Sequence, residues 1–381
     1  MNDIPTISWI EAGQSRSARW HSENGAPPPK RVVIADDQMS ADSAYRLACE
    51  GTALLWRGDF QNARQLLQAL ARRIDRAPRK PAKIAAPTPS PTEAFHLHRQ
   101  AQAQRARVLA MLLLPFEQDF RIPLRRAPDV RQACNEAYGA PAGPFVASLR
   151  ELLGLIGAHE WRKNGVDIPA LGQRIHPHYG VFSPVRGEYV GLVADAPLPA
   201  MQASLAFDIG TGSGVLAAVL ARRGIKDVVA TDQDPRALAC ARDNLARLKL
   251  DHQVALLQVD LFPPGRAPLI ICNPPWLPAR PSSAIEHAIY DPDSRMLRGF
   301  LGGLAAHLEP GGEGWLILSD LAEHLGLRPR AELMAMIDAA GLKVLGRIDV
   351  KPQHPKVSDA SDPLHAARAA ELTSLWRLAV A

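Results

Sequence analysis

The second half of the chain alternates short apolar runs with segments of helical periodicity, and this pattern constrains the fold more than any other feature. Short, continuous apolar runs are typical of strands that are buried on both faces. Repeated β-α units predict an α/β fold with an open, doubly wound, seven-stranded and mostly parallel sheet that carries helices on both faces. The expected strands lie near 205–209, 227–232, 254–260, 269–273, 314–320, 342–350 and 372–380, and expected helices include 214–223, 235–248 and 329–340.

The first part of the chain has a different pattern, which predicts a mainly helical N-terminal domain over residues 31–160. Between Ser40 and Arg76 apolar residues recur at helical spacing, and Arg57-Gly58-Asp59 interrupts them, so we expect two helices there. Further helices are expected over 93–114, 129–138 and 144–159.

The remaining segments are expected to precede or connect these domains. Residues 1–30 are polar and punctuated by Pro and Gly, so we expect them to be poorly ordered. Residues 76–91 are rich in proline and basic side chains, and predict an extended tether. Asn164-Gly165 lies between short extended runs, which predicts a linking β-hairpin within 161–200, followed by the catalytic domain over 201–381.

Composition narrows the possible functions. No apolar run approaches the roughly 18 residues that span a bilayer, and the N-terminus shows no signal peptide, so no membrane association is expected. Four widely spaced cysteines without a CxxC pair predict buried free thiols in a reducing cytoplasm, and neither they nor the histidines predict a metal site. The net charge of +5 arises from a basic excess in residues 1–170, which predicts at most a weak phosphate-attracting surface.

A glycine-rich turn follows the first strand of the α/β half. Asp208 ends that strand, and Gly210, Gly212 and Gly214 lead with Thr211 into a helix, where free N–H groups and a close backbone approach favour a nucleotide ligand. The turn also fits the fingerprint of a nicotinamide or flavin enzyme, so an oxidoreductase is an alternative.

Acidic residues end the next two strands. Asp232, followed by Gln233, lies where a carboxylate can accept both hydroxyls of a ribose. Asp260 and Leu261 follow the third strand, where they can meet an adenine edge. Capping of the following helices would explain either carboxylate alone, but not three acids in succession at strand ends.

The fourth strand ends in Asn273-Pro274-Pro275-Trp276. The order DIGTGSG, TDQDP, VDLF, NPPW and LEPGG resembles the class I S-adenosylmethionine-dependent methyltransferases over about residues 180–381. The resemblance implies S-adenosylmethionine as cofactor. It also implies that Asp208 and the three glycines enclose the methionine part, Asp232 binds the ribose, and Asp260 with Leu261 binds the adenine.

The NPPW residues suit the methylation of a planar nitrogen. Such a nitrogen is a poor nucleophile because its lone pair is delocalised, so the enzyme must position it. Asn273 Oδ1 and the Pro274 carbonyl can accept its two N–H bonds, the prolines stiffen the turn, and Trp276 offers a flat face for stacking.

The chain resembles most closely the release-factor glutamine N5-methyltransferases and the small-domain N-methyltransferases. The likeness includes the segment FSPVRGEY at 182–189, in which Phe182 and Arg186 are candidates for closing over the cofactor, and Tyr290-Asp291-Pro292. Trp276 replaces the usual Tyr and Asp291 the usual Glu. The resemblance implies a protein glutamine as substrate, for example in a translation factor, with an amino group of RNA or DNA as the alternative.

Overall fold

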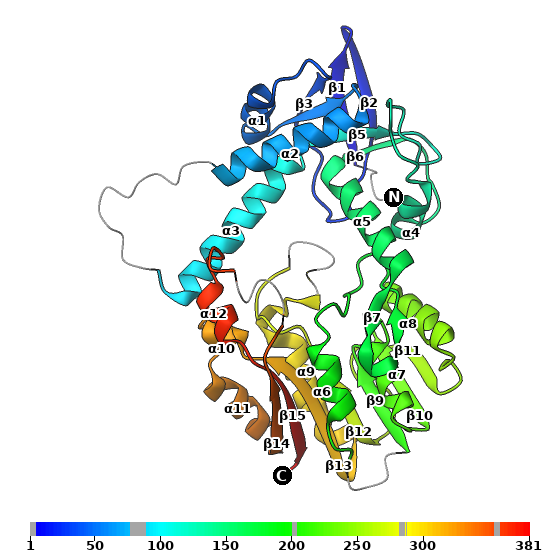
Figure 1. Ribbon diagram of the computed structural model, residues 1–381, viewed down its shortest axis with the longest axis vertical. Helices are drawn as coiled ribbons and strands as arrows, with labels where there is room; N and C mark the ends of the chain where they lie inside the picture. The colour runs from blue at the N-terminus through cyan, green and yellow to red at the C-terminus, as the bar shows by residue number, and fades with distance from the viewer. Residues whose placement is uncertain (1–4, 77–88, 200–203, 282–285, 287, 354–358) are drawn as a thin grey trace. The chain divides into compact units, whose positions relative to one another are not determined.

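The computed structural model describes residues 5–76, 89–199, 204–281, 286, 288–353 and 359–381 (Figure 1). The chain divides into two compact units. Unit 1 comprises residues 1–88 and 96–160, and unit 2 comprises 89–95 and 161–381. Among the described residues, no helix has the length and apolar character needed to cross a membrane.

Unit 1 is built on a six-stranded mixed sheet, which corrects the prediction of a mainly helical domain. Its strand order is β1-β2-β6-β5-β4-β3, in which β3, β4 and β5 are parallel and β6 runs antiparallel to β5. The strands are β1 (Thr6–Glu11), β2 (Gln14–Trp20), β3 (Arg31–Ala35), β4 (Thr52–Trp56), β5 (Leu112–Phe116) and β6 (Phe145–Ser148). The helices are α1 (Ala41–Cys49), α2 (Phe60–Arg76), α3 (Pro91–Leu109), α4 (Arg131–Tyr138) and α5 (Leu149–Asn164).

The strands that the prediction assigned to helices, β4, β5 and β6, are short and mostly apolar. All five residues of β4 are buried, so the run shows no alternation and its leucines also fit a helical spacing. The expected disorder of 1–30 is likewise wrong where the structure describes it, because β1 and β2 form an antiparallel hairpin there. The proline-rich tether falls mostly on residues outside the described part of the chain. Helices α1, α2 and α4 agree with the prediction.

Unit 2 contains the seven-stranded sheet that the sequence predicts. Its order is β11-β10-β9-β12-β13-β15-β14, and all neighbours are parallel except β15, which runs antiparallel to both β13 and β14. The strands are β9 (Leu205–Ile209), β10 (Asp227–Asp232), β11 (Val254–Gln258), β12 (Ala267–Cys272), β13 (Leu308–Ser319), β14 (Leu342–Val350) and β15 (Thr373–Val380).

Helices cover both faces of this sheet. On one face α6 (Glu188–Asp195) and α7 (Val215–Arg222) pack with part of α8 (Pro235–Leu248) over Ala206, Leu269 and Ile271. On the other face α9 (Arg295–His307) and α11 (Arg330–Ala339) pack over Phe207, Ile270 and Cys272. The sheet is therefore the middle of three layers (Figure 1), and a central strand such as β12 is buried on both sides for that reason.

Short elements complete unit 2. The linking hairpin consists of β7 (Val166–Ile168) and β8 (Gln173–Ile175), joined through η1 (Pro169–Leu171). Its turn is therefore not at Asn164-Gly165, because Asn164 still belongs to α5. The other elements are η3 (Pro292–Ser294), α10 (Leu321–His324) and α12 (His365–Ala370).

The cysteines agree only in part with the prediction of buried thiols. Cys134, Cys240 and Cys272 are buried, whereas Cys49 at the end of α1 is exposed. Burial raises the pKa of Cys134 to about 12 and that of Cys240 to about 11.

Candidate functional site

The candidate residues follow strands that are neighbours in the sheet. Cys272 of β12 pairs with Ile209 of β9, and Ile209 pairs in turn with Thr231 of β10. The residues that come next in the three strands are Asn273, Gly210 and Asp232. Because parallel strands end at the same edge, these three residues follow adjacent strand ends in one row.

The glycine loop requires a backbone that other residues rarely adopt. Gly210, Gly212 and Gly214 have φ of 72°, 56° and 81°. A Cβ on Gly212 would meet no atom within 4 Å, so the middle of the loop faces open space. A Cβ on Gly214 would lie 3.1 Å from the Cα of Ala241 in α8, so this glycine also permits close packing of the loop against a helix.

Asp208 accepts hydrogen bonds that hold the glycine loop in place. Its buried Oδ2 accepts hydrogen bonds from Thr211 Oγ1 at 2.6 Å and from the Ala217 amide at 3.0 Å. Burial raises the pKa of Asp208 to about 6. The Thr211 amide donates to the Thr231 carbonyl at 2.8 Å, so this residue joins the loop to β10. Asp208 and Thr211 therefore contact the loop itself and give it its shape.

Asp232 lies at the opening of the loop. Its Oδ2 accepts from the Gly212 amide at 3.0 Å and its Oδ1 from the Asp234 amide at 2.9 Å. Each carboxylate oxygen has capacity for a second donor. Burial raises the pKa of Asp232 above its ordinary value. The neighbouring Gln233 accepts at its backbone carbonyl from Gln258 Nε2 at 3.3 Å.

Asp260 and Leu261 are linked to the start of α9. Asp260, whose side chain is half exposed, forms an ion pair with Arg295. Leu261 has φ of 71°, and its carbonyl accepts from Thr231 Oγ1 at 2.6 Å. Its side chain lies against Gly299, where a Cβ would collide with it. The third strand end is therefore fixed both to β10 and to α9.

The NPPW residues form a compact turn with an internal hydrogen bond. The Trp276 indole N–H donates to Asn273 Oδ1 at 2.8 Å. Pro274 is buried, and Asn273 and Trp276 are partly exposed. The Trp276 ring packs against the apolar clusters on both faces of the sheet, so it lies beyond the strand ends. The four residues thus lie in one turn, in which one acceptor site of Asn273 Oδ1 is already used, and their role in binding a substrate nitrogen stays a prediction.

The Tyr290-Asp291-Pro292 stretch connects this turn to α9. Leu277, the residue after the turn, pairs with Tyr290 as an isolated bridge, and its carbonyl accepts from the Asp291 amide at 2.8 Å. The buried Asp291 carboxylate accepts from the Met296 and Leu297 amides at 3.0 and 3.1 Å, and so caps α9. Burial raises the pKa of Asp291.

Two residues near this turn were not predicted. Met296 reaches the glycine loop, because a Cβ on Gly210 would collide with its methyl group. Arg328 is 2% exposed and donates to the Trp276 carbonyl and to Ser294 Oγ, each at 3.3 Å. Neither residue belongs to a recognisable motif. The contacts between α9 and the strand ends arise from the tertiary fold, and no pattern in the sequence predicts them.

Phe182 and Arg186 lie apart from the hydrogen bonds described so far. Phe182 is partly buried against the cluster beneath α6. Arg186 lies 3.6 Å from the carboxylate of Glu371, which is fully buried and accepts from Ser319 Oγ at 2.7 Å. Burial raises the pKa of Glu371. Arg186 therefore connects the segment 182–189 to the residues before β15, and its place near a cofactor stays a prediction.

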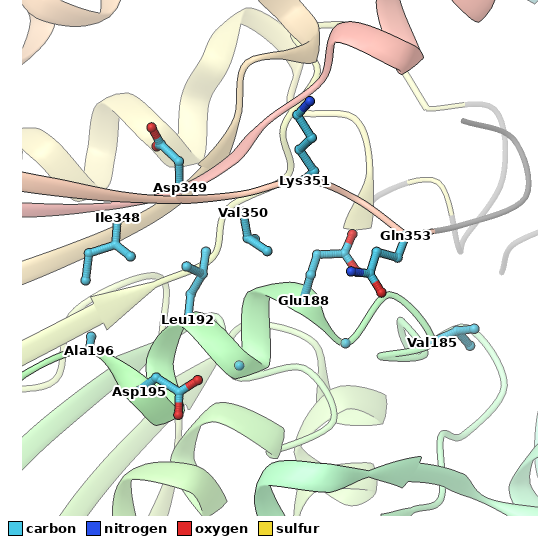
Figure 2. Close-up of a pocket in the computed structure, with 12 residues that line it drawn as sticks. Val185, Glu188, Leu192, Asp195, Ala196, Ile348, Asp349, Val350, Lys351 and Gln353 are labelled. Carbon is cyan, nitrogen blue, oxygen red and sulfur yellow. The ribbon is translucent and has the colours of Figure 1, made fainter. Parts of the chain in front are cut away.

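A cavity of about 520 Å³ lies between α6 and β14 (Figure 2). Leu192, Ile348 and Val350 converge on it, while Asp349 and Lys351 point to the other side of the strand. It includes Val185 and Glu188 of the segment 182–189, but none of the residues predicted to bind cofactor or to act in catalysis.

Part of the chain is similar to known methyltransferases. Residues 173–329 match the family model of the methyltransferase small domain. The release factor glutamine methyltransferase of Cereibacter sphaeroides is 33% identical over 175 residues, which cover 42% of this chain and 58% of that protein. The protein of the same name from Caulobacter vibrioides is 30% identical over 177 residues, or 44% of this chain and 61% of that protein.

The chain is also similar to a ribosomal protein L11 methyltransferase. The ribosomal protein L11 methyltransferase of Symbiobacterium thermophilum is 33% identical over 144 residues, which cover 38% of this chain and 40% of that protein. A methyltransferase structure from Pyrococcus furiosus has a TM-score of 0.39 at 18% identity, over 60% of this chain and 98% of that one.

The matches extend over part of each protein. The chain spans about three fifths of the length of the two glutamine methyltransferases. The family match covers β8 to the residue before α11, and so includes the glycine loop, Asp232, Asp260 and the NPPW turn. It favours a methyltransferase over the nicotinamide enzyme that the glycine fingerprint alone allowed. The part of the chain that carries the candidate site, residues 173–329, is thus the part that is similar to the methyltransferase small domain.

Proposed function

We propose that the chain is an S-adenosylmethionine-dependent N-methyltransferase that acts on a planar amide or amino nitrogen, with a glutamine side chain of a cytoplasmic protein as its substrate. The observation that carries this proposal is the row formed by Asp232, Gly210 and Asn273 at adjacent strand ends. In this row a carboxylate that could accept ribose hydroxyls, a glycine loop and an amide oxygen that could accept an N–H follow adjacent strands.

The residues of the row fit the cofactor. The open side of Gly212 leaves room for a ligand against the loop, and Asp232 retains acceptor capacity for a hydroxyl group. Met296 covers Gly210 with the end of a flexible side chain, which can move at little cost. When bound, S-adenosylmethionine would supply an electrophilic methyl group on a sulfonium.

The NPPW turn would orient the nitrogen that accepts the methyl group. Asn273 Oδ1 accepts one N–H from Trp276 and has a second lone pair for an N–H of the substrate. The Pro274 carbonyl would accept the other N–H, and the Trp276 ring offers a face on which the planar group can stack. The proton leaves after methylation, when the nitrogen has become acidic, so this scheme needs no general base.

The names of the relatives support a protein substrate. The two glutamine methyltransferases and the L11 methyltransferase are all named for proteins. An amino group of RNA or DNA is the alternative, because the same turn can hold the exocyclic nitrogen of a base and residues 1–170 carry a basic excess.

The proposal is tested by incubating the purified chain and cell extract with cofactor labelled in its methyl group. We expect label in material that resists nuclease and is removed by protease. Label that nuclease removes, with transfer that falls steeply as salt rises, would identify a nucleic acid instead. If neither fraction gains label above an extract without the enzyme, the proposed function is wrong.

Asn273→Ala provides the matched variant for this experiment. It removes the amide acceptor but leaves the glycine loop and Asp232 in place, so we expect transfer to fall at least 100-fold. Cofactor affinity, measured by calorimetry, should stay within a few-fold of the wild type. Wild-type turnover in the variant would refute the role of the amide.

A further inference from the structure

Trp276 is held at two points. Its indole N–H donates to Asn273 Oδ1, and its backbone carbonyl accepts from Arg328 Nη2. The first contact orients the Asn273 amide, because the oxygen must face the indole while the NH2 group faces away. The second contact fixes the peptide that carries the ring.

Arg328 is an unusual residue to find at such a place. Its guanidinium is buried, and burial lowers its pKa. A buried charge is costly unless it is paired and hydrogen-bonded. Nη1 donates to Ser294 Oγ, and the carboxylates of Glu332, Glu323 and the buried Asp291 contribute compensating negative charge. Since Asp291 also caps α9, the guanidinium lies among groups that are themselves fixed.

The planar shape of the guanidinium is what this place requires. Nη1 and Nη2 point in fixed directions, so one group can bind the Ser294 hydroxyl before α9 and the Trp276 carbonyl after β12. A lysine ammonium has a single nitrogen at the end of a flexible stem, and would hold the two acceptors less firmly.

We propose that Arg328 is a positioning residue for the NPPW turn, which acts through Trp276 to set the orientation of the Asn273 amide. The chain of contacts runs from the Arg328 guanidinium to the Trp276 carbonyl, then through the indole N–H to Asn273 Oδ1. It leaves one lone pair of that oxygen in a fixed direction for an N–H donor of the substrate. The effect of these contacts on catalysis rests on the proposed function, but the contacts themselves do not.

The test follows the indole N–H of Trp276 by NMR in the full-length chain labelled with ¹⁵N-tryptophan. The protein contains seven tryptophans, so the Trp276 signal is assigned as the one that Trp276→Phe removes. Asn273→Ala supplies the reference for an indole that has lost its acceptor. In Asn273→Ala we expect the Trp276 indole signal to move upfield and the exchange of the indole proton with solvent to become at least 10-fold faster.

Arg328→Met removes both donors with little loss of volume. We expect the Trp276 signal to move in the same direction as in Asn273→Ala, and methyl transfer to fall at least 10-fold while cofactor affinity stays within 3-fold. Arg328→Lys should restore part of both properties. Arg347→Met is the matched control, because Arg347 also contacts a tryptophan, lying over Trp376 at 5.1 Å from the ring centre, but pairs with Asp349. It should leave the Trp276 signal and transfer unchanged.

The outcomes separate this proposal from the proposed function. A wild-type Trp276 signal in folded Arg328→Met overturns the positioning role, whatever the enzyme does. If Arg328→Met does not fold, Arg328→Lys decides, and an unchanged signal and unchanged turnover in that variant overturn the role as well. If the signal moves as expected but no variant, including the wild type, transfers methyl groups to extract, the contact chain is supported and the proposed function fails.

Discussion

The buried carboxyl of Asp208 should make unit 2 less stable as pH rises. We consider the substitution Asp208→Asn, which has nearly the same shape and no charge. Both hydrogen bonds to Asp208 reach the same oxygen, Oδ2, so the amide oxygen of asparagine can accept both. The variant therefore removes the titration while it keeps the contacts that shape the glycine loop.

The expected magnitude follows from the shift in pKa. Burial raises the pKa of Asp208 from 3.8 to about 6. A carboxyl with a raised pKa in the folded state stabilises the fold fully below its unfolded pKa, and this contribution is lost as pH rises through the folded pKa. At about 1.4 kcal/mol per unit, the full loss relative to Asp208→Asn is about 3 kcal/mol, of which about 2.4 kcal/mol falls between pH 4 and pH 7.

Urea unfolding at several pH values between 4 and 7 measures this difference. Hydrogen exchange of peptides from β9 and β12 during the titration reports the free energy of unfolding of unit 2 separately from unit 1. Asp227→Asn is the control, because Asp227 is an exposed carboxyl at the start of β10. Parallel stability curves for wild type and Asp208→Asn, with no divergence between pH 4 and 7, would refute the reasoning.

Two further substitutions test the loop and its partner. Asp232→Ala removes the acceptor for Gly212 and the proposed ribose contact, so calorimetry should show at least 10-fold weaker binding of S-adenosylmethionine, and an unchanged dissociation constant would contradict the assignment. Gly214→Ala should lower the melting temperature more than Gly224→Ala does. Both have positive φ, which costs about 1–2 kcal/mol, but only the first brings a Cβ to 3.1 Å from Ala241. Equal losses in the two variants would show that the contact with α8 is unimportant.

The fold of unit 2 could be predicted because its signals are local. Each strand is a short apolar run, and the turn after β9 needs glycines at three positive φ values. The row of strand ends follows directly, since parallel strands place their carboxyl ends at one edge. The sequence of unit 1 does not mark its strands and turns with such local signals. Leu54 and Leu55 in β4 fit a helix as well as a buried strand, and the choice between them is made by pairing with strands far along the chain.

The candidate site was predicted only in outline. The NPPW residues identify a turn, but not that the Trp276 indole uses one lone pair of Asn273. Met296 of α9 comes near the glycine loop, and Arg328 before α11 comes near the NPPW turn, but no spacing in the sequence connects them to these places. Their roles depend on tertiary packing, which residue patterns do not encode.

The unequal exposure of the thiols provides a native attachment point for a probe. Three cysteines are buried, and burial raises the pKa of all three thiols, so maleimide reagents should react at Cys49. A fluorophore placed there would sit on unit 1 without any engineered mutation. Its anisotropy would then report, in the unaltered protein, whether a macromolecule engages the part of the chain that has no assigned role.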